Sequence, residues 1–164
     1  MALRSLGFGI TPKEFIDGYV VADPSWTDPS SYWGSPYDTG ASFPPGMVNA
    51  ANAYLEEQGS SMRAVDATGT DFAKLRDLAA QGIPVLIWTT VSGNPPNYSG
   101  ESVGGRYAWY LNEHCVLMYG VEGDYVLVSD PLAGLLDKDA ESFGSLYEAC
   151  GSYALYIMDG MADG

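Results

Sequence analysis

The chain has 164 residues, a length typical of a single domain that can bury a hydrophobic core. Its formal net charge is −14, which disfavours nucleic acids and anionic membrane surfaces as partners, and its 46% of apolar residues disfavours disorder. Two cysteines and one histidine provide neither a disulfide framework nor the ligand spacing of a zinc site, so we expect no metal and no other cofactor.

The first residues indicate the end of a helix. Leu3 and Leu6 lie at helical spacing. A glycine at position 7 or 9 ends the helix, but no capping residue precedes it. Because helices without a cap are uncommon, we expect the chain to begin inside a helix of a longer protein. The alternative is a genuine, short and frayed N-terminal helix.

A capping box predicts a second short helix. Thr11 caps this helix, Pro12 takes its first position, and Glu14 completes the box. We expect the helix to end near Gly18.

Residues 22–46 form a long segment without helical or strand periodicity. They are rich in Pro, Gly, Ser and Asp, and aromatic residues are interleaved among them: Trp26, Tyr32, Trp33, Tyr37 and Phe43. A loop of this length in a compact domain is usually functional or disordered, and the aromatic residues argue against disorder. The segment is therefore a functional loop or an Ω-loop packed by its own side chains, and both interpretations can hold together.

The middle of the chain contains both helices and strands. Apolar residues at helical spacing predict a helix over 44–58 and another that ends at Gly82, with a short strand over 62–67 between them. The run 84–91 is almost wholly apolar and rich in β-branched residues, which indicates a central strand buried on both faces. Trp88 lies inside this run, so we expect it in the core and not at a substrate surface.

The later part of the chain is dominated by predicted strands. Residues 92–106 form a second loop rich in Gly, Pro, Asn and Ser, and 107–111 add a strand. A short helix is expected over 142–150, and a last strand over 153–158 joins the sheet. Helices come first and hairpin strands late, which indicates the α+β class. No repeat or linker divides the chain, so residues 1–164 are predicted to form one domain.

A β-hairpin precedes that last helix. Two apolar runs, 112–121 and 125–131, flank a three-residue connection with Gly123 in its middle. If Val121 pairs with Tyr125, the numbers of paired residues sum to 246. This register determines which side chains of the two strands share a face.

In this register the only histidine comes next to a carboxylate. Asp130 lies opposite Val116, and side-chain alternation puts His114 on the same face, about 7–8 Å away at the backbone. A carboxylate beside an imidazole fixes its tautomer and stabilises its protonated form, as in a catalytic triad. The alternative is structural, because a lone histidine at a strand start and Asp-Pro at a strand end are also ordinary features.

The motifs of this hairpin resemble those of a known family. Asn-Glu-His-Cys-Val at 112–116, a short apolar strand, a glycine and a second strand leading into Ser-Asp-Pro-Leu-Ala-Gly at 129–134 are similar to papain-like cysteine peptidases. The resemblance is to those related to the bacteriocin-leader-processing peptidases, and more narrowly to their free-standing bacterial branch. The resemblance runs from about residue 3 to residue 158. Weaker similarities are found at 34–37, 43–45 and 82–88 and in the closing helix and strand.

The resemblance implies a papain-like fold with helices packed on one side of a mostly antiparallel sheet. It implies hydrolysis of peptide bonds by a Cys-His-Asp mechanism, with His114 as general base and Asp130 orienting it. The substrate would be a peptide or protein. It would lie in a cleft bordered by the 22–46 loop, with Trp26, Trp33 and Tyr37 as the candidate cleft residues.

The nucleophile of the resembled family is missing from this chain. In the family a cysteine begins a helix, shortly after a glutamine that stabilises the oxyanion. Cys115 adjoins His114, but strand alternation turns it to the opposite face, and Cys150 lies on the apolar side of a late helix. No Gly-x-Ser-x-Gly elbow offers a serine instead. The family's nucleophile is expected upstream of this chain, a helical turn or two before Ala2.

Three hypotheses remain open on the sequence alone. The chain is a cysteine peptidase domain truncated before its nucleophile, a peptide-binding module with a peptidase-like fold, or a purely structural domain in which His114 and Asp130 form a buried polar pair.

The cellular location is an expectation from the resemblance only. Many relatives are exported or displayed on the surface of Gram-positive bacteria, which implies the same for the parent protein. In the chain itself, no apolar run is long enough to span a membrane, and no signal peptide is evident.

Overall fold

The computed structural model describes residues 1–23, 25, 27–38 and 40–160. Its centre is a six-stranded sheet in the order β10-β9-β8-β5-β11-β4, and every neighbouring pair is antiparallel. The strands are β4 (Met62–Asp66), β5 (Val85–Thr90), β8 (Glu113–Glu122), β9 (Tyr125–Asp130), β10 (Gly134–Asp139) and β11 (Ala154–Asp159). The predicted α+β class with a mostly antiparallel sheet is confirmed, and the four strands predicted for it all belong to it.

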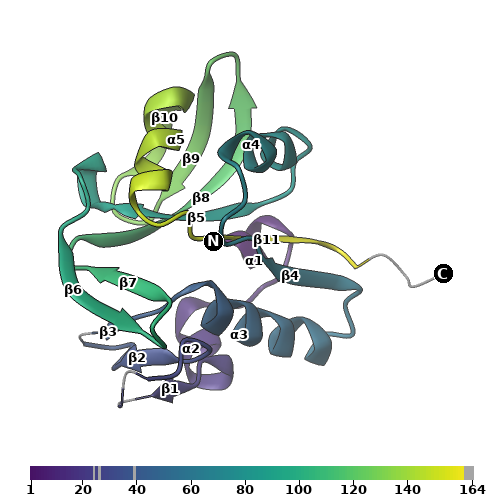
Figure 1. Ribbon diagram of the computed structural model, residues 1–164. Helices are drawn as coiled ribbons and strands as arrows, with labels where there is room; N and C mark the ends of the chain where they lie inside the picture. The colour runs from purple at the N-terminus through teal and green to yellow at the C-terminus, as the bar shows by residue number, and fades with distance from the viewer. Residues whose placement is uncertain (24, 26, 39, 161–164) are drawn as a thin grey trace.

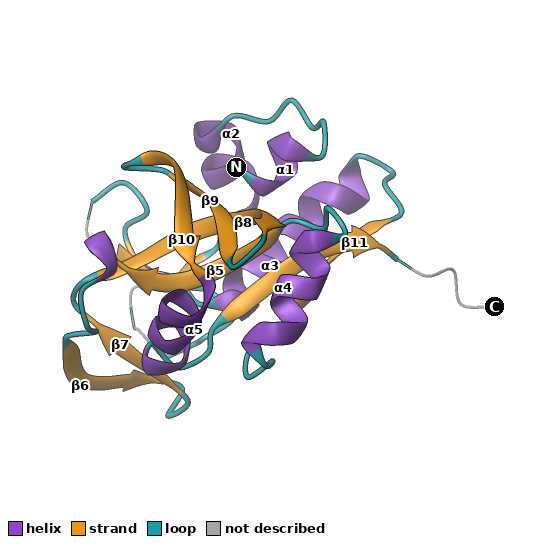
Figure 2. Ribbon diagram, turned by 90° about the horizontal axis from the view of Figure 1, so that it is seen from above, coloured by secondary structure: helices purple, strands orange, loops and turns teal. Residues whose placement is uncertain are grey.

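Helices cover both faces of this sheet, and the prediction that they pack on one side is wrong. In Figure 1, α4 and α5 lie above β5 and β11, while α2 and α3 lie below; Figure 2 shows α4 and α5 on the near side of the sheet. The helices are α1 (Ala2–Ser5), α2 (Pro12–Tyr19), α3 (Pro44–Glu57), α4 (Phe72–Ala80) and α5 (Ala140–Ala149).

The physical reason lies in the central strand β5. Trp88 points into one core with Leu55 of α3, whereas Ile87 points into a second core with Phe143 of α5. We call these the α3-side core and the α5-side core. A strand that is apolar on both faces needs cover on both, and one layer of helices cannot provide it.

The N-terminal elements form as the local sequence predicts. In the capping box of α2, the Thr11 hydroxyl accepts a hydrogen bond from the Glu14 backbone N–H (3.3 Å), and Glu14 Oε2 accepts one from the Thr11 backbone N–H (2.8 Å). Helix α3 begins at its two prolines and is followed by Gly59, whose φ of +63° suits glycine. Among the described residues, no helix has the length and apolar character needed to cross a membrane.

The 22–46 segment is tied to the α3-side core. It contains a small sheet of β1 (Ala22–Asp23), β2 (Tyr32–Gly34) and β3 (Gly40–Ala41). Trp33 and Phe43 are fully buried with ring centroids 4.9 Å apart, and Phe43 contacts Tyr153 of the closing segment at 5.1 Å. The segment therefore packs through its own aromatic residues onto the rest of the molecule.

Besides the three short strands of the 22–46 segment, two further strands were not predicted. Residues 92–106, expected to be a loop, contain β6 (Tyr98–Val103), which pairs with β7 (Tyr107–Tyr110) after a short 3-10 turn at Val91–Gly93. Strand β10 was also missed. Both lack a clean apolar alternation, because each has only one neighbouring strand and exposes most of its residues.

Candidate active site

His114 and Asp130 form a hydrogen-bonded pair where β8 begins and β9 ends. His114 Nε2 lies 2.8 Å from Asp130 Oδ1, and the two side chains are 9% and 13% exposed. An ionised carboxylate can only accept a hydrogen bond, so in the neutral imidazole the proton is on Nε2. The lone pair is then on Nδ1, which makes that atom the one able to take a proton from another group.

The register between β8 and β9 follows the prediction near the site but differs from it near the turn. Leu117 pairs with Ser129 and Met118 with Val128, so paired numbers sum to 246 near the site, as predicted. Close to the turn, Glu122 pairs with Tyr125, and the connection has two residues instead of three. An irregularity between Met118 and Gly120 absorbs the difference, as a β-bulge does.

The carboxylate of Asp130 is held by the chain that follows it. Oδ1 also accepts hydrogen bonds from the backbone N–H groups of Leu132 (2.8 Å) and Ala133 (3.2 Å). Burial alone would raise the pKa of Asp130, but these two bonds and the one from His114 outweigh burial and lower it. Asp130 is thus an ionised, fixed partner for the imidazole.

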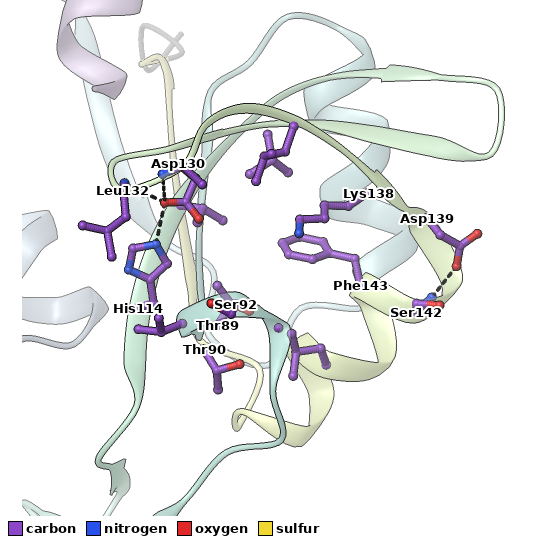
Figure 3. A pocket seen from close by; sticks show the side chains of 17 residues that line it. Thr89, Thr90, Ser92, His114, Asp130, Leu132, Lys138, Asp139, Ser142 and Phe143 are labelled. Atoms are coloured by element: carbon purple, nitrogen blue, oxygen red, sulfur yellow. Dashed lines mark hydrogen bonds and ion pairs between the residues drawn. The ribbon is translucent and has the colours of Figure 1, made fainter.

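A cavity of about 410 Å³ adjoins the pair. His114 and Asp130 form one wall, Thr89 of β5 lies at its base, and Lys138 of β10 and Phe143 of α5 lie opposite (Figure 3). The cavity can hold a ligand beside the His114 imidazole, whose Nε2 is already hydrogen-bonded to Asp130.

The predicted cleft residues do not line this cavity. Trp26 lies outside the described residues. Trp33 is fully buried in the α3-side core and borders a different hollow, next to Trp109. Tyr37 is 61% exposed and donates a hydrogen bond to Asp17 of α2. The described residues of the 22–46 loop do not line the cavity beside His114, because the small sheet and buried aromatics tie them to the α3-side core. Their assignment to a substrate cleft stays a prediction.

Neither cysteine is placed to attack a substrate beside His114. Cys115 packs against the α3-side core, on the sheet face away from His114, and burial raises the pKa of its thiol. Cys150 is fully buried in the same core, and burial raises its pKa to about 11. Cys115 is partly buried and Cys150 is buried, and both positions agree with the expectation of unactivated thiols.

Several residues of the cavity were missed from the sequence. Leu136 and Lys138 line it from β10, and Phe143 and Leu146 from α5. The two-residue spacing of Leu136 and Lys138 and the helical spacing of Phe143 and Leu146 were visible signals. Finding the cavity required knowing that β10 pairs with β9, which brings them next to His114.

Comparisons with known proteins agree with this architecture. Residues 1–155 match the model of the Peptidase_C39 like family. Comparison with curated proteins gives no match. The relationship to papain-like cysteine peptidases predicted from the hairpin motifs is confirmed.

A solved structure shows the same fold. The crystal structure of a Bacillus anthracis protein described as a C39-like peptidase matches with a TM-score of 0.77 and 20% identity, over 96% of this chain and 84% of that one. The Pseudomonas avirulence protein AvrPphB matches with a TM-score of 0.31 and 13% identity, over 68% of this chain and 60% of that one, which is too low to carry an argument. With nearly its whole length matched by the family model, the chain belongs to the Peptidase_C39 like family.

Proposed function

We propose that this chain provides the His–Asp half of a cysteine peptidase site that hydrolyses peptide bonds. His114 accepts the proton of a thiol through Nδ1, and Asp130 holds the imidazole through Nε2. The single observation that carries the proposal is the 2.8 Å bond from His114 Nε2 to Asp130 Oδ1 at the wall of a cavity. This bond leaves Nδ1 as the basic nitrogen.

The proposal places the nucleophile outside this chain. Cys115 and Cys150 are excluded by their burial and by the sheet between Cys115 and the imidazole. Helix α1 begins next to strand β9, since the Ser129 hydroxyl donates a hydrogen bond to Met1 Sδ at 3.6 Å, although strand alternation turns Ser129 to the sheet face opposite Asp130. A cysteine one or two turns upstream of Ala2 is the candidate nucleophile.

The test compares this chain with one extended by the upstream genomic sequence. We expect no peptide hydrolysis by the 164-residue chain and thiol-dependent hydrolysis by the extended one. In the extended chain, His114→Ala abolishes turnover, and Asp130→Asn lowers it by about two to four orders of magnitude, because the amide cannot support the imidazolium. Arg63→Ala, on the distant strand β4, is the matched control and leaves turnover unchanged.

An extended chain with no upstream cysteine, or with an unreactive one, contradicts the peptidase proposal. Peptide binding without hydrolysis then favours the binding module, and no binding at all favours a structural His114–Asp130 pair. Export of the parent protein to the cell surface stays a proposal from the family resemblance, and fractionation of the source cells tests it.

A further inference from the structure

We propose that the cavity beside His114 is a subsite for a peptide segment that presents an apolar side chain next to a carboxylate, with Lys138 binding the carboxylate. The inference takes one assumption from the proposed function, namely that the peptide bond of a substrate lies next to His114. It concerns which peptides the chain recognises, and binding alone can test it.

The cavity is mostly apolar at its base and sides. Val116 and Val128 come from the central strands, Leu136 from β10, and Phe143 and Leu146 from α5. Its volume of about 410 Å³ is in the usual range of about 300–1,000 Å³ for small-ligand pockets. An apolar side chain placed there loses much of its contact with water, which favours its binding.

Lys138 is the charged side chain of this cavity that has no ionic partner among the described residues. The two carboxylates of the cavity are already engaged: Asp130 by His114, and Asp139 by the backbone N–H of Ser142 at 2.8 Å. Figure 3 shows Lys138 across the cavity from His114. The cavity therefore offers a free cation to a ligand, but no free anion.

A second, independent observation is the hydroxyl of Thr89. Thr89 lines the cavity and is 3% exposed, and its Oγ1 has no hydrogen-bond partner among the described residues. A buried hydroxyl without a partner is unfavourable unless a water molecule or a ligand group meets it. The hydroxyl hydrogen rotates freely, so Thr89 can donate to a carboxylate or accept from a peptide N–H.

The carboxylate can come from two sources. It is the α-carboxylate of a C-terminal apolar residue, or the side chain of an acidic residue beside an apolar one. Both present the same anionic acceptor to Lys138, and charge-assisted hydrogen bonds of this kind are roughly twice as strong as neutral ones. The peptides chosen for the test separate the two sources.

The experiment uses the 164-residue chain and measures peptide binding by calorimetry and by NMR. His114 is the only histidine, so its ring resonances report ligands in the cavity without ambiguity. The probes are acetyl-Ala-Ala-Phe with a free C-terminus, the same peptide as its C-terminal amide, and acetyl-Ala-Glu-Phe-amide, whose carboxylate is on a side chain. We expect at least one carboxylate peptide to bind about tenfold more tightly than acetyl-Ala-Ala-Phe-amide and to shift the His114 signals.

Variants assign the contacts. Lys138→Met keeps the apolar stem, and we expect it to remove the preference for the carboxylate, whereas Lys74→Met on the surface of α4 leaves it intact. Thr89→Val keeps the shape of the side chain, and we expect it to weaken binding without lowering the unfolding temperature. Equal binding of acid and amide, or an unchanged preference in Lys138→Met, overturns the proposal. Lys138-dependent binding in a chain that never hydrolyses peptides would leave this subsite standing and remove only the peptidase proposal.

Discussion

Glu113 precedes His114, but strand alternation turns its carboxyl to the other face of the sheet. Burial raises the pKa of Glu113 to about 8, and an interaction with Trp88 offsets this only in part. Its Oε2 has no hydrogen-bond partner among the described residues. The carboxyl is therefore held neutral near pH 7, one residue away from a histidine that needs an ionised carboxylate as its partner.

This buried carboxyl predicts a pH-dependent stability. Between pH 4.5 and about 8, Glu113 is protonated in the folded chain and ionised in the unfolded chain, so the unfolded state binds fewer protons. The free energy of unfolding then falls as pH rises through this window, by at most ~1.4 kcal/mol per pH unit from this group. Urea denaturation between pH 5 and pH 8 measures the slope, and Glu113→Gln should flatten it. Parallel curves for the two proteins would show that the carboxyl is not buried.

The thiols give a second prediction at this scale. Because burial raises the pKa of Cys115 and Cys150, both should react slowly with iodoacetamide at pH 7, and equally slowly in His114→Ala. Labelling is mapped by mass spectrometry, with the urea-unfolded chain as a control that labels fast at both positions. Fast labelling of either cysteine that depends on His114 would make that cysteine the nucleophile and remove the need for one upstream.

Single residues differ in how far the sequence predicted their positions. Strand alternation and a hairpin register were enough to bring His114 to Asp130 and to turn Cys115 away, because both are properties of local backbone geometry. Thr89 and Lys138 could not be placed in this way. They meet His114 only through the pairing of β5 and β10 with their neighbours, which depends on contacts between distant parts of the chain.

At the scale of elements, β5 is buried along almost its whole length. Trp88 is 2% exposed, and its Nε1 donates a hydrogen bond to the backbone carbonyl of Ser42 at 2.7 Å. We expect Trp88→Ala to lower the free energy of unfolding by about 3–5 kcal/mol, because it leaves a cavity and an unpaired carbonyl. Leu135→Ala, at a 74% exposed site on β10, is the control and should change it by less than about 0.5 kcal/mol. A loss below about 1 kcal/mol in Trp88→Ala would contradict its role in the core.

Helices and strands with a strong local sequence pattern were predicted, whereas features that depend on pairing with another strand were not. The capping box of α2, the apolar run of β5 and the two hairpin strands all formed where expected. The bulge near Tyr119 was not predicted. It connects the register near the site with the register near the turn, which differ by one residue. Strand β10 was missed because it lies at the sheet edge, where Leu135 is exposed and no alternation of buried residues marks the strand.

The whole molecule has two cores, on opposite faces of its sheet, which can unfold together or separately. The described tryptophans Trp33, Trp88 and Trp109 all belong to the α3-side core. Ile87, which precedes Trp88 in β5, is fully buried in the α5-side core, and this core contains no described tryptophan. Because β5 and its neighbours supply both cores, we expect one cooperative unit, as predicted for a single domain.

Ile87→Ala tests this unity directly. We expect the substitution to lower the free energy of unfolding by about 2–5 kcal/mol. Tryptophan fluorescence, measured in a Trp26→Phe background so that only the tryptophans of the α3-side core contribute, should shift to lower urea concentration together with far-ultraviolet circular dichroism, which reports all helices and strands. Coincident midpoints in the wild type and in the variant show that damage in one core is transmitted to the other through the shared strands. If the fluorescence midpoint stays in place while the circular dichroism acquires a second transition, the two cores unfold as separate units and the single-domain prediction is wrong.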